Sequence, residues 1–442
     1  MTEPDLRTLA DTGDLPALQR RLHSATVPDV VEELGRLDGS RRALVFRAIS
    51  KDRALDVFED LDPQIQRELL DDLREQATAE LIEGLDPDDR AVLLEEVPAG
   101  IVNRLLTGMS SDERAMTTTL LGYPAQSAGR RMTPELVALP QPLTVGAALE
   151  HVLEQSHDAE TIYLMPVVGD GRYVVGVVSL RRLLVSDPTT PLTQVMSTPV
   201  MVQATDDQEH AAQVVRDNGM LAVPVVDAED RLLGLFTVDD AMRVLEKEED
   251  EDVAFSGATA PLRRPYLSVT VLRLMRVRVP WLLILLLAAS LTVAVQDYFE
   301  ETLDQVVALA LFVPLLIGTG GNAGAQCATT VVRAMAVGDV RMRDLPRVVG
   351  REMTTGALVG IALAAVGFVP IGLFAGWDIA IVLGLALVAT CVLATTAGSA
   401  IPMFARRVGV DPAVVSAPFI TTVVDSTGLV IYFLIAQAVL GL

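Results

Sequence analysis

The chain has 442 residues, half of them apolar, and a formal net charge of −23. Residues 263–442 contain 12 Arg, no Lys and 10 acidic residues, a net of +2, so residues 1–262 carry −25. An acidic half of this kind repels nucleic acid and anionic lipid and favours divalent cations or basic partners. The simpler interpretation is that the charge only keeps this half dispersed. Only Cys327 and Cys391 occur, which excludes a disulfide framework.

A turn signal recurs every 24 residues within residues 1–130, which predicts an acidic domain of stacked helical hairpins. The signals are Leu37-Asp38-Gly39, Leu61-Asp62-Pro63, Leu85-Asp86-Pro87 and Met109-Ser110-Ser111. Asp62 and Asp86, each followed by Pro, are predicted helix N-caps. Ser110 with Glu113 predicts a capping box. Because the first ten residues lack the basic and apolar regions of a signal peptide, we expect this half in the cytoplasm.

Paired carboxylates lie on the outer faces of these predicted helices. Neighbouring carboxylates repel each other until a cation arrives, so they can chelate weakly bound divalent ions. Taken singly, each pair is also typical of a solvated helix face. The acids are Glu59, Asp60, Asp71, Asp72, Asp88, Asp89, Glu95 and Glu96.

Residues 131–190 and 191–245 are two copies of one α/β unit, since the run from Met165 to Val168 is repeated 58 residues later from Val223 to Val226. Each copy predicts helix, strand, turn, strand and helix. The pair resembles tandem CBS domains, a module that often senses adenine nucleotides. In that family a Thr or Ser followed three positions later by Asp holds the ribose. Thr237 and Asp240 match this pattern, whereas the first copy has Ser179 and Arg182. The resemblance implies one ATP site; a purely structural pair is the alternative.

The helical pattern of the second copy continues into a connecting segment, residues 246–262. Among its acids are Glu246, Glu249 and Asp250. Like charges along one helix repel by a few tenths of a kcal/mol for each i,i+4 pair. Bound cations or a basic surface would relieve this repulsion.

Residues 263–442 contain five apolar runs, each predicted to span a membrane. They fall at Val279–Val295, Val306–Gly320, Thr354–Gly376, Ile379–Phe404 and Val414–Leu442. The distribution of Arg places the N-terminus inside and the C-terminus outside. The second run is expected to break at the Gly-rich stretch that contains Gly318 and Asn322, which must pack in protein or line water. Close packing of helices on the glycines is the competing interpretation. Pro314, Pro370, Pro402 and Pro418 are expected to kink their helices.

Asp425 lies in the last run, where a carboxylate costs at least about 2.5–3.5 kcal/mol. Residues 263–442 contain no Lys or His to pair with it. At helical spacing Thr421, Thr422 and Asp425 share a face, which predicts the wall of a wet cation pathway. Oxygen ligands favour Mg²⁺ or Ca²⁺ over zinc or copper. A two-fold dimer would bring two such acids together. In the alternative interpretation, Asp425 is protonated or hydrogen-bonded and only holds the helices together.

The runs Pro314–Gln326 and Pro418–Asp425, together with the preceding domains, resemble the MgtE magnesium transporter family over essentially the whole chain. The resemblance implies a multidomain membrane protein: an all-α N-terminal helical superhelix, tandem α/β CBS domains, an acidic connecting plug helix and a five-helix transmembrane bundle. It implies a homodimeric Mg²⁺-selective channel for magnesium uptake in the inner membrane. Cytosolic Mg²⁺ bound to the acidic surfaces would close it, with ATP as a modulator. Asp425 matches the family's pore aspartate and Asp411 an acid near the cytoplasmic mouth.

Three other functions compete with this one. An ion-coupled secondary carrier for Mg²⁺ or Co²⁺ would use Asp425 as a proton site. An intramembrane metalloprotease would need His-Glu-x-x-His on a membrane helix, and all four His residues lie in the acidic half, so no enzyme is expected. A sensor without transport leaves the polar last span unexplained.

Overall fold

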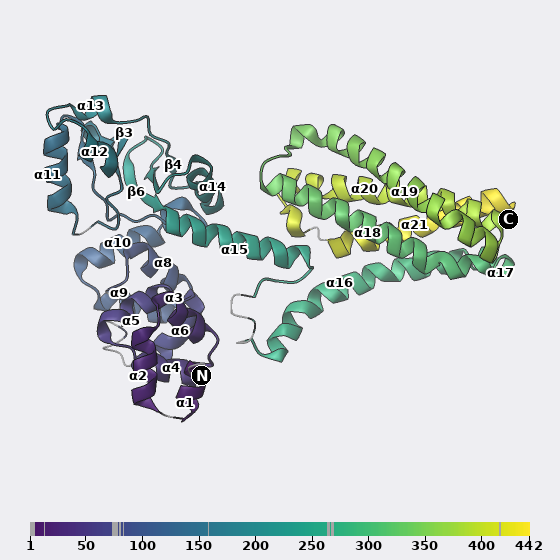
Figure 1. The fold of residues 1–442 in the computed structure, drawn as a ribbon, viewed down its shortest axis with the longest axis horizontal. Coiled ribbons are helices and arrows are strands. Elements are labelled where there is room, and N and C mark those ends of the chain that lie inside the picture. The colour runs from purple at the N-terminus through teal and green to yellow at the C-terminus, as the bar shows by residue number, and fades with distance from the viewer. Residues whose placement is uncertain are drawn as a thin grey trace. The chain divides into compact units, whose positions relative to one another are not determined.

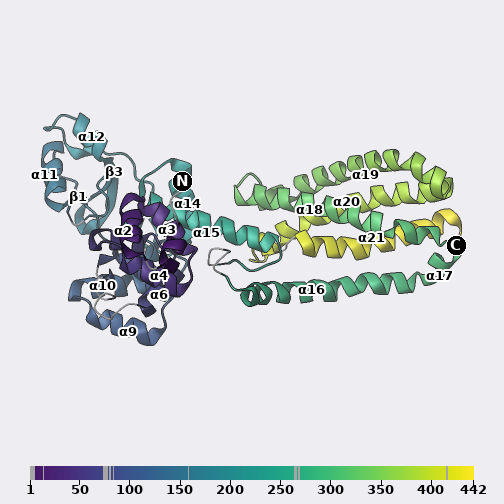
Figure 2. The ribbon, with the colours of Figure 1, turned by 60° about the horizontal axis from the view of Figure 1, so that its bottom comes forward.

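The computed structural model describes residues 5–12, 14–72, 78, 81–82, 84–157, 159–262, 266, 269–414 and 417–442. The side chains of Asp71 and Asp72, two of the predicted cation-binding acids, lie outside the described part. The chain forms two compact units, Met1–Glu248 with Arg263–Val269, and Glu249–Leu262 with Thr270–Leu442. Figure 1 shows the helical repeat and the small sheets of the first unit, and Figure 2 the long helices of the second.

Short helices make up the N-terminal part of the first unit. They are α1 (Leu6–Thr12), α2 (Leu15–Ser24), α3 (Val27–Gly35), α4 (Gly39–Arg47), α5 (Lys51–Glu59), α6 (Pro63–Asp72), α8 (Pro87–Glu95), α9 (Ala99–Gly108) and α10 (Ser111–Leu121). The apolar residue that opens each turn signal, Leu37, Leu61, Leu85 or Met109, is buried in one continuous core. The predicted helical repeat is therefore confirmed, because each turn returns an apolar side chain to that core.

The same 24-residue period places a polar side chain, buried in three of the four cases, on the end of the preceding helix. Arg42 donates to the carbonyls of Leu34 (3.1 Å) and Leu37 (2.6 Å). Arg90 donates in the same way to Ile82 (2.8 Å) and Leu85 (2.6 Å). The last carbonyls of a helix have no partner within the helix, so these donors satisfy groups that would otherwise be buried unbonded. Gln66 and Arg114 repeat the arrangement, on Phe58 (2.6 Å) and Met109 (3.0 Å).

The capping predictions are confirmed only in part. Asp62 accepts from the Gln64 amide (2.8 Å) at the start of α6, and Ser110 accepts from the Glu113 amide (3.3 Å) at the start of α10. The predicted capping box at Ser110 is incomplete, because the Glu113 carboxylate pairs with the Arg90 guanidinium instead. A buried cation outcompetes one exposed amide for this carboxylate.

The two α/β copies form equivalent three-stranded sheets, β1-β2-β3 and β4-β5-β6. The strands are β1 (Leu139–Pro140), β2 (Leu164–Val168), β3 (Val174–Ser179), β4 (Val202–Gln203), β5 (Ala222–Val226) and β6 (Leu232–Thr237). In each sheet the first two strands are parallel and the last two antiparallel, with an irregularity at Val167/Val168 and at Val225/Val226. The helices are α11 (Val145–Gln155), α12 (Leu180–Val185), α13 (Leu192–Val195), α14 (Gln208–Asn218) and α15 (Val238–Ser256).

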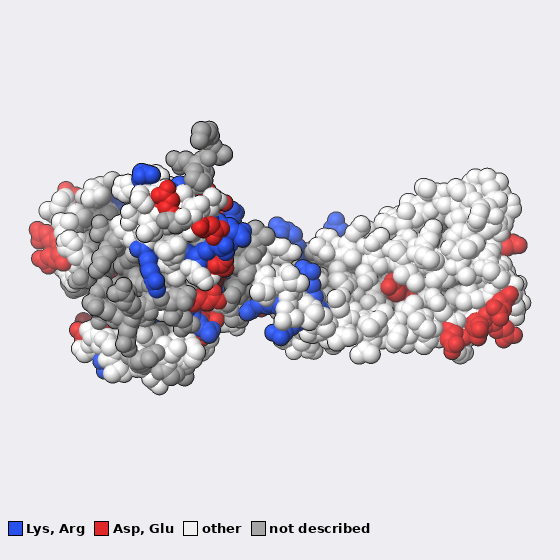
Figure 3. Space-filling view, turned by 90° about the horizontal axis from the view of Figure 1, so that it is seen from below, with Lys and Arg blue, Asp and Glu red and all other residues white. Residues whose placement is uncertain are grey.

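The described part of the second unit contains five helices long and apolar enough to cross a membrane, as expected. They are α16 (Val271–Tyr298), α18 (Ala308–Ala336), α19 (Leu345–Ala375), α20 (Trp377–Arg407) and α21 (Ala417–Leu440), with the short α17 (Glu300–Gln305) after α16. In Figure 3 this unit shows a wide and almost uncharged surface with one acidic spot in its middle, and acidic side chains are gathered at one end. The turn between α16 and α18 carries Asp297, Glu300, Glu301 and Asp304.

The Gly-rich stretch does not break the second membrane helix, so that prediction is wrong. Helix α18 is continuous from Ala308 to Ala336. A continuous helix satisfies its own backbone groups, and the glycines serve close packing, which was the competing interpretation. A Cβ added to Gly320 would lie 2.6 Å from Thr390 of α20, and one added to Gly324 would lie 3.3 Å from Ile420 of α21.

The prolines act differently from one another. Pro314, Pro370 and Pro402 lie inside α18, α19 and α20. Pro418 is the second residue of α21, where no intrahelical amide bond is lost, so the expected kink there is wrong. Its carbonyl instead accepts from the hydroxyls of Thr421 (2.9 Å) and Thr422 (2.8 Å).

The repeated polar donors give a direct stability test. Replacing Arg90, 1% exposed, by Met leaves the carbonyls of Ile82 and Leu85 unbonded and should lower the opening free energy of α8 by about 3 kcal/mol. Native-state hydrogen exchange of the α8 amides measures this free energy. Arg114→Met removes the equivalent but exposed donor and should cost less than about 1 kcal/mol. Equal effects would show that the buried bonds contribute nothing special.

Candidate functional site

A group of three acids, two buried and one half-buried, lies where the helical repeat meets the second α/β copy. Asp88 and Asp89 come from the first turn of α8, and Asp240 from the first turn of α15. One carboxylate oxygen of each lies within 4.8 Å of the other two. Oxygens around a Mg²⁺ ion lie about 3–4 Å apart, so small side-chain movements would let the three, called here the acid cluster, share one ion.

The acid cluster lacks a full set of partners. Asp88 is only 3% exposed, and its Oδ1 has no hydrogen-bond partner among the described residues. Glu160, from the first α/β copy, also has a buried oxygen, Oε2, without a partner there. Buried carboxylate oxygens normally accept hydrogen bonds. Two such oxygens without a described partner, Asp88 Oδ1 and Glu160 Oε2, therefore indicate a place for a cation.

Three described contacts join one arginine to neighbouring acids, two of which belong to the acid cluster. The Arg243 guanidinium lies 3.2 Å from Asp89 Oδ1, 3.6 Å from Asp240 Oδ1 and 3.5 Å from Asp60 Oδ1. Arg243 itself belongs to α15, three residues after Asp240. The repeat and the α/β copy are thus held together by charge across their contact.

Burial and mutual repulsion raise the pKa of these carboxyl groups. Burial first, then Asp240, raises the pKa of Asp89 to about 7, against the lowering effect of Arg243. Burial and Asp240 raise the pKa of Asp88 well above its ordinary value. Burial first, then repulsion by Asp240, Asp86 and Asp239, raises the pKa of Glu160 to about 8, although a hydrogen bond with Thr133 opposes this. All three groups favour a bound proton until a metal cation replaces it.

The other predicted cation-binding acids are in different situations. Glu59 faces Asp86 and Asp89, and burial followed by this repulsion raises its pKa to about 7. Glu95 is paired with Arg130 (2.7 Å) and Arg131 (4.0 Å), which neutralise it. Glu96 is half-buried. The remaining acids, Glu246, Glu249 and Asp250, are exposed along α15 and are not part of the acid cluster.

The two residues predicted to bind a ribose are hydrogen-bonded to each other. Thr237 donates its hydroxyl to Asp240 Oδ2 (2.9 Å), and both side chains are buried. Asp240 therefore belongs to the predicted nucleotide site and to the acid cluster at once. In the first copy Ser179 caps α12 by accepting from the Arg182 amide (3.3 Å).

The membrane unit brings Asp425 and Thr421 to the same glycine. A Cβ added to Gly321 of α18 would lie 3.5 Å from the Thr421 Cβ and 3.6 Å from Asp425 Oδ1. Among the described residues nothing hydrogen-bonds to that oxygen. The face of α21 that Thr421 and Asp425 were predicted to share therefore lies against Gly321 of α18. Gly318 and Asn322 of that helix are exposed on the chain, as is Asp411 before α21.

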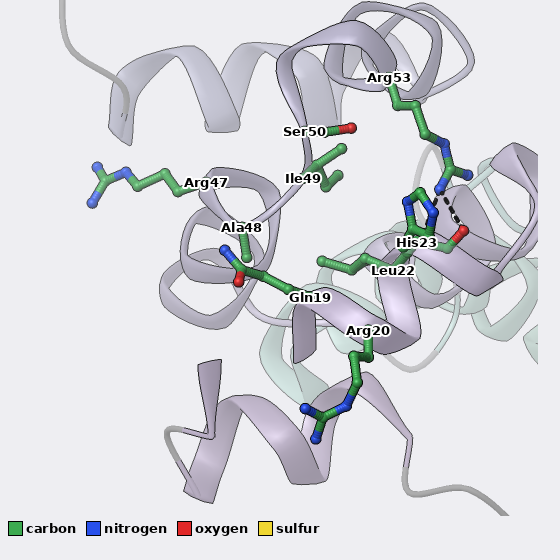
Figure 4. Close-up of a pocket in the computed structure, with 9 residues that line it drawn as sticks. All are labelled: Gln19, Arg20, Leu22, His23, Arg47, Ala48, Ile49, Ser50 and Arg53. Carbon is green, nitrogen blue, oxygen red and sulfur yellow. Dashed lines mark hydrogen bonds between the residues drawn. The ribbon is translucent and has the colours of Figure 1, made fainter. Parts of the chain in front are cut away.

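A cavity of about 480 Å³ lies between α2 and the α4–α5 turn (Figure 4). Cationic side chains line it, but they do not converge. Arg53 donates to the carbonyls of Leu22 and Ala25 at the end of α2, and in Figure 4 the Arg20 and Arg47 guanidinium groups point away from the other lining residues. The cavity offers no focused binding group.

Comparison with known proteins gives a consistent result. A family model described as a divalent cation transporter, MgtE, matches residues 313–435, one described as the MgtE intracellular N domain matches residues 25–126, and CBS domains match 128–187 and 192–247. The magnesium transporter MgtE of Thermus thermophilus is 38% identical over 457 residues, covering 98% of each chain. The chain belongs to the MgtE family of magnesium transporters.

Two further relatives support this membership. The Enterococcus faecalis magnesium transporter MgtE is 37% identical over 320 residues, covering 72% of this chain and 70% of the relative. A crystal structure of the cytosolic domain of the Mg²⁺ channel MgtE in complex with ATP is 34% identical, with a TM-score of 0.51, and covers 54% of this chain and 98% of the solved one. The family and the five long apolar helices together make this MgtE chain a multi-pass membrane protein.

Sequence reasoning missed two residues of the acid cluster's surroundings. Glu160 stands alone in a loop between α11 and β2, and Arg243 sits in a mixed-charge helix. Neither has a spacing that marks it, because the acids of the helical repeat that they face are distant in sequence, although Arg243 also contacts Asp240 three residues before it.

The raised pKa values predict how stability depends on pH. The pKa of Asp89 and that of Glu59, each about 7, exceed the value of an unfolded carboxyl, so their protonation favours the folded unit. This contribution is complete below about pH 4 and is lost as the pH rises through about 7. Between about pH 5 and about pH 8 the first unit, without Mg²⁺, should lose about 1–2 kcal/mol of stability. Hydrogen exchange of α8 measures this; millimolar Mg²⁺ should abolish the loss, and a loss that persists would contradict metal binding.

Proposed function

We propose that the chain is a Mg²⁺-selective channel for magnesium uptake, with Asp425 in the ion pathway. The main support is the position of Asp425. Its carboxylate lies on an apolar helix beside Gly321 of α18, and its Oδ1 has no hydrogen-bond partner among the described residues. A carboxylate at such a depth needs water or a cation. The relatives' names as magnesium transporters supply the ion. Because Mg²⁺ dehydrates reluctantly, the ion would pass with water still bound.

We propose that two copies of the chain share the pathway. One Asp425 per chain is little charge for a divalent ion, and a two-fold axis would double it. Gly318 and Asn322, in the same stretch of α18, are exposed on a single chain. A surface that faces a second copy, or water between two copies, would be exposed in this way. The distribution of Arg favours an N-terminus in the cytoplasm and a C-terminus outside an inner, plasma-type membrane, with Asp411 near the cytoplasmic mouth.

We propose that cytosolic Mg²⁺ closes the channel through the acid cluster. Without a cation, the three closely spaced carboxylates repel one another and favour separation of the repeat from the α/β copies. A bound Mg²⁺ neutralises them and shifts the equilibrium toward the joined form. Exposed acids of α15, namely Glu246, Glu249 and Asp250, together with Glu59 and Asp60, would add weaker sites, and α15 would act as the plug helix.

ATP is proposed as a modulator, because the solved relative contains it and Thr237 and Asp240 match the ribose-binding pattern. Binding would require opening the bond between these two side chains. Thr237→Val should weaken ATP binding at least about fivefold in titration calorimetry, because the ribose loses a hydroxyl partner. Unchanged affinity in both Thr237→Val and Asp240→Ala would reject this site.

The pathway is tested at Asp425. Asp425→Asn keeps the shape and removes the charge, and should lower Mg²⁺ current through reconstituted protein at least about tenfold, since the neutral amide no longer attracts a divalent ion. Thr427→Val is the matched control, because this exposed hydroxyl donates to the carbonyls of Val423 (2.7 Å) and Val424 (3.4 Å) in its own helix. Undiminished current in Asp425→Asn would contradict the proposal.

The same recordings separate a channel from the carrier alternative. A channel passes Mg²⁺ as the only permeant cation and needs no proton gradient, whereas an ion-coupled carrier saturates at low rates and depends on that gradient.

The regulatory site is tested at Asp89. Asp89→Asn should raise the internal Mg²⁺ concentration that closes the channel about fivefold or more, because one of the three proposed ligands loses its charge. Asp217→Asn is the control: it removes an exposed carboxylate that contacts only the neighbouring Arg216 in the described structure. An equal shift in both variants would show that overall charge, and not the acid cluster, sets the closing concentration.

A further inference from the structure

Arg243 occupies part of the coordination space of the acid cluster. Its guanidinium contacts Asp89 (3.2 Å) and Asp240 (3.6 Å), two of the three clustered acids, and reaches Asp60 (3.5 Å) outside the cluster. The third acid, Asp88, has its Oδ1 buried without a partner among the described residues. The arginine therefore compensates the acid cluster only in part and leaves its deepest oxygen unbonded.

We propose that Arg243 is a tethered cation that competes with Mg²⁺ for the acid cluster and so sets the Mg²⁺ concentration at which the channel closes. The proposal rests on the proposed regulatory site. A Mg²⁺ ion needs short, nearly octahedral contacts with its oxygens. It cannot take Asp89 and Asp240 fully while a guanidinium shares them.

The chemistry of arginine suits this role. A guanidinium stays charged at every physiological pH, so the competing cation is not lost through its own titration. It is weakly hydrated and bonds through a wide planar fork, whereas Mg²⁺ demands compact oxygen ligands. The buried oxygen of Asp88 therefore favours the metal, while the outer oxygens of Asp89 and Asp240 serve either cation.

The position of Arg243 lets it give way. Its side chain is 46% exposed, so it lies at the edge of the cluster and can move without opening the core. Asp60 remains available as a partner after Mg²⁺ has taken the other two. A competing state lowers the apparent affinity for the ion by the fraction of protein in that state. Because the arginine is part of the chain, its local concentration at the acid cluster does not depend on the salts in solution.

A purely structural role predicts the opposite result. If Arg243 only fastened the helical repeat to the α/β copy, its removal would separate the halves of the Mg²⁺ site and weaken binding. Competition requires that its removal strengthens binding. The sign of the change in Mg²⁺ affinity therefore distinguishes the two roles.

The experiment compares Arg243→Gln with Arg216→Gln in the full chain in detergent. Arg216 is equally exposed, at 46%, and pairs with the surface acid Asp217, so its replacement makes the same change in net charge away from the cluster. Calorimetric titration with Mg²⁺ should show about threefold to tenfold tighter binding for Arg243→Gln and no change for Arg216→Gln. Protection of the first unit from protease should appear at a correspondingly lower Mg²⁺ concentration.

Arg243→Lys provides a second variant in case the Gln variant does not fold. A lysine keeps the charge but cannot span three carboxylates, so its Mg²⁺ affinity should lie between those of the wild type and Arg243→Gln. Unchanged or weaker binding in the Gln variant, or in the Lys variant if only that one folds, overturns the competition. Absence of Mg²⁺ binding to the first unit of the wild-type protein would instead overturn the proposed regulatory site.

Discussion

The first unit depends on one electrostatic constraint: carboxylates have been taken out of water side by side. Asp88, Asp89 and Asp240 lie at the contact between the helical repeat and the second α/β copy. There they lose hydration and repel one another. Protons, a guanidinium or a divalent cation can each offset this cost. In the proposed regulation, the joined form of the unit is linked to the cation supply, because a cation that binds only the joined form stabilises it.

The rigid repeat holds this constraint in place. Arg90, directly after Asp89, is fixed by the carbonyls of Ile82 and Leu85 and by Glu113. With Arg90 anchored, the first turn of α8 cannot rotate to bring its acids to water. Arg90 and the acid cluster are therefore adjacent for a physical reason. The hydrogen bonds that hold Arg90 in place also keep Asp88 and Asp89 largely out of water.

The membrane unit meets a similar constraint with different means. Gly320, Gly321 and Gly324 let α18 approach the helices that carry Thr390, Ile420 and Asp425. Thr421 and Thr422 donate their hydroxyls to the Pro418 carbonyl, so their oxygen lone pairs remain available along the face of α21. The result is a surface of small residues and oxygens around one carboxylate. Such a surface suits a hydrated ion better than a bare one.

The sequence by itself determined the elements and their order, because local patterns carry that information. The 24-residue period, the 58-residue repeat, the apolar runs and the acid Asp425 are all visible without coordinates. Only the tertiary structure decided how the stretches meet. It kept α18 continuous through its glycines, paired Glu113 with Arg90 in place of the predicted cap, and buried Asp88, which the sequence placed on an outer helix face. It also joined Asp240 to the acids of α8 and set Arg243 and Glu160 beside them. These outcomes rest on contacts between residues far apart in the chain, whose energies no local pattern records.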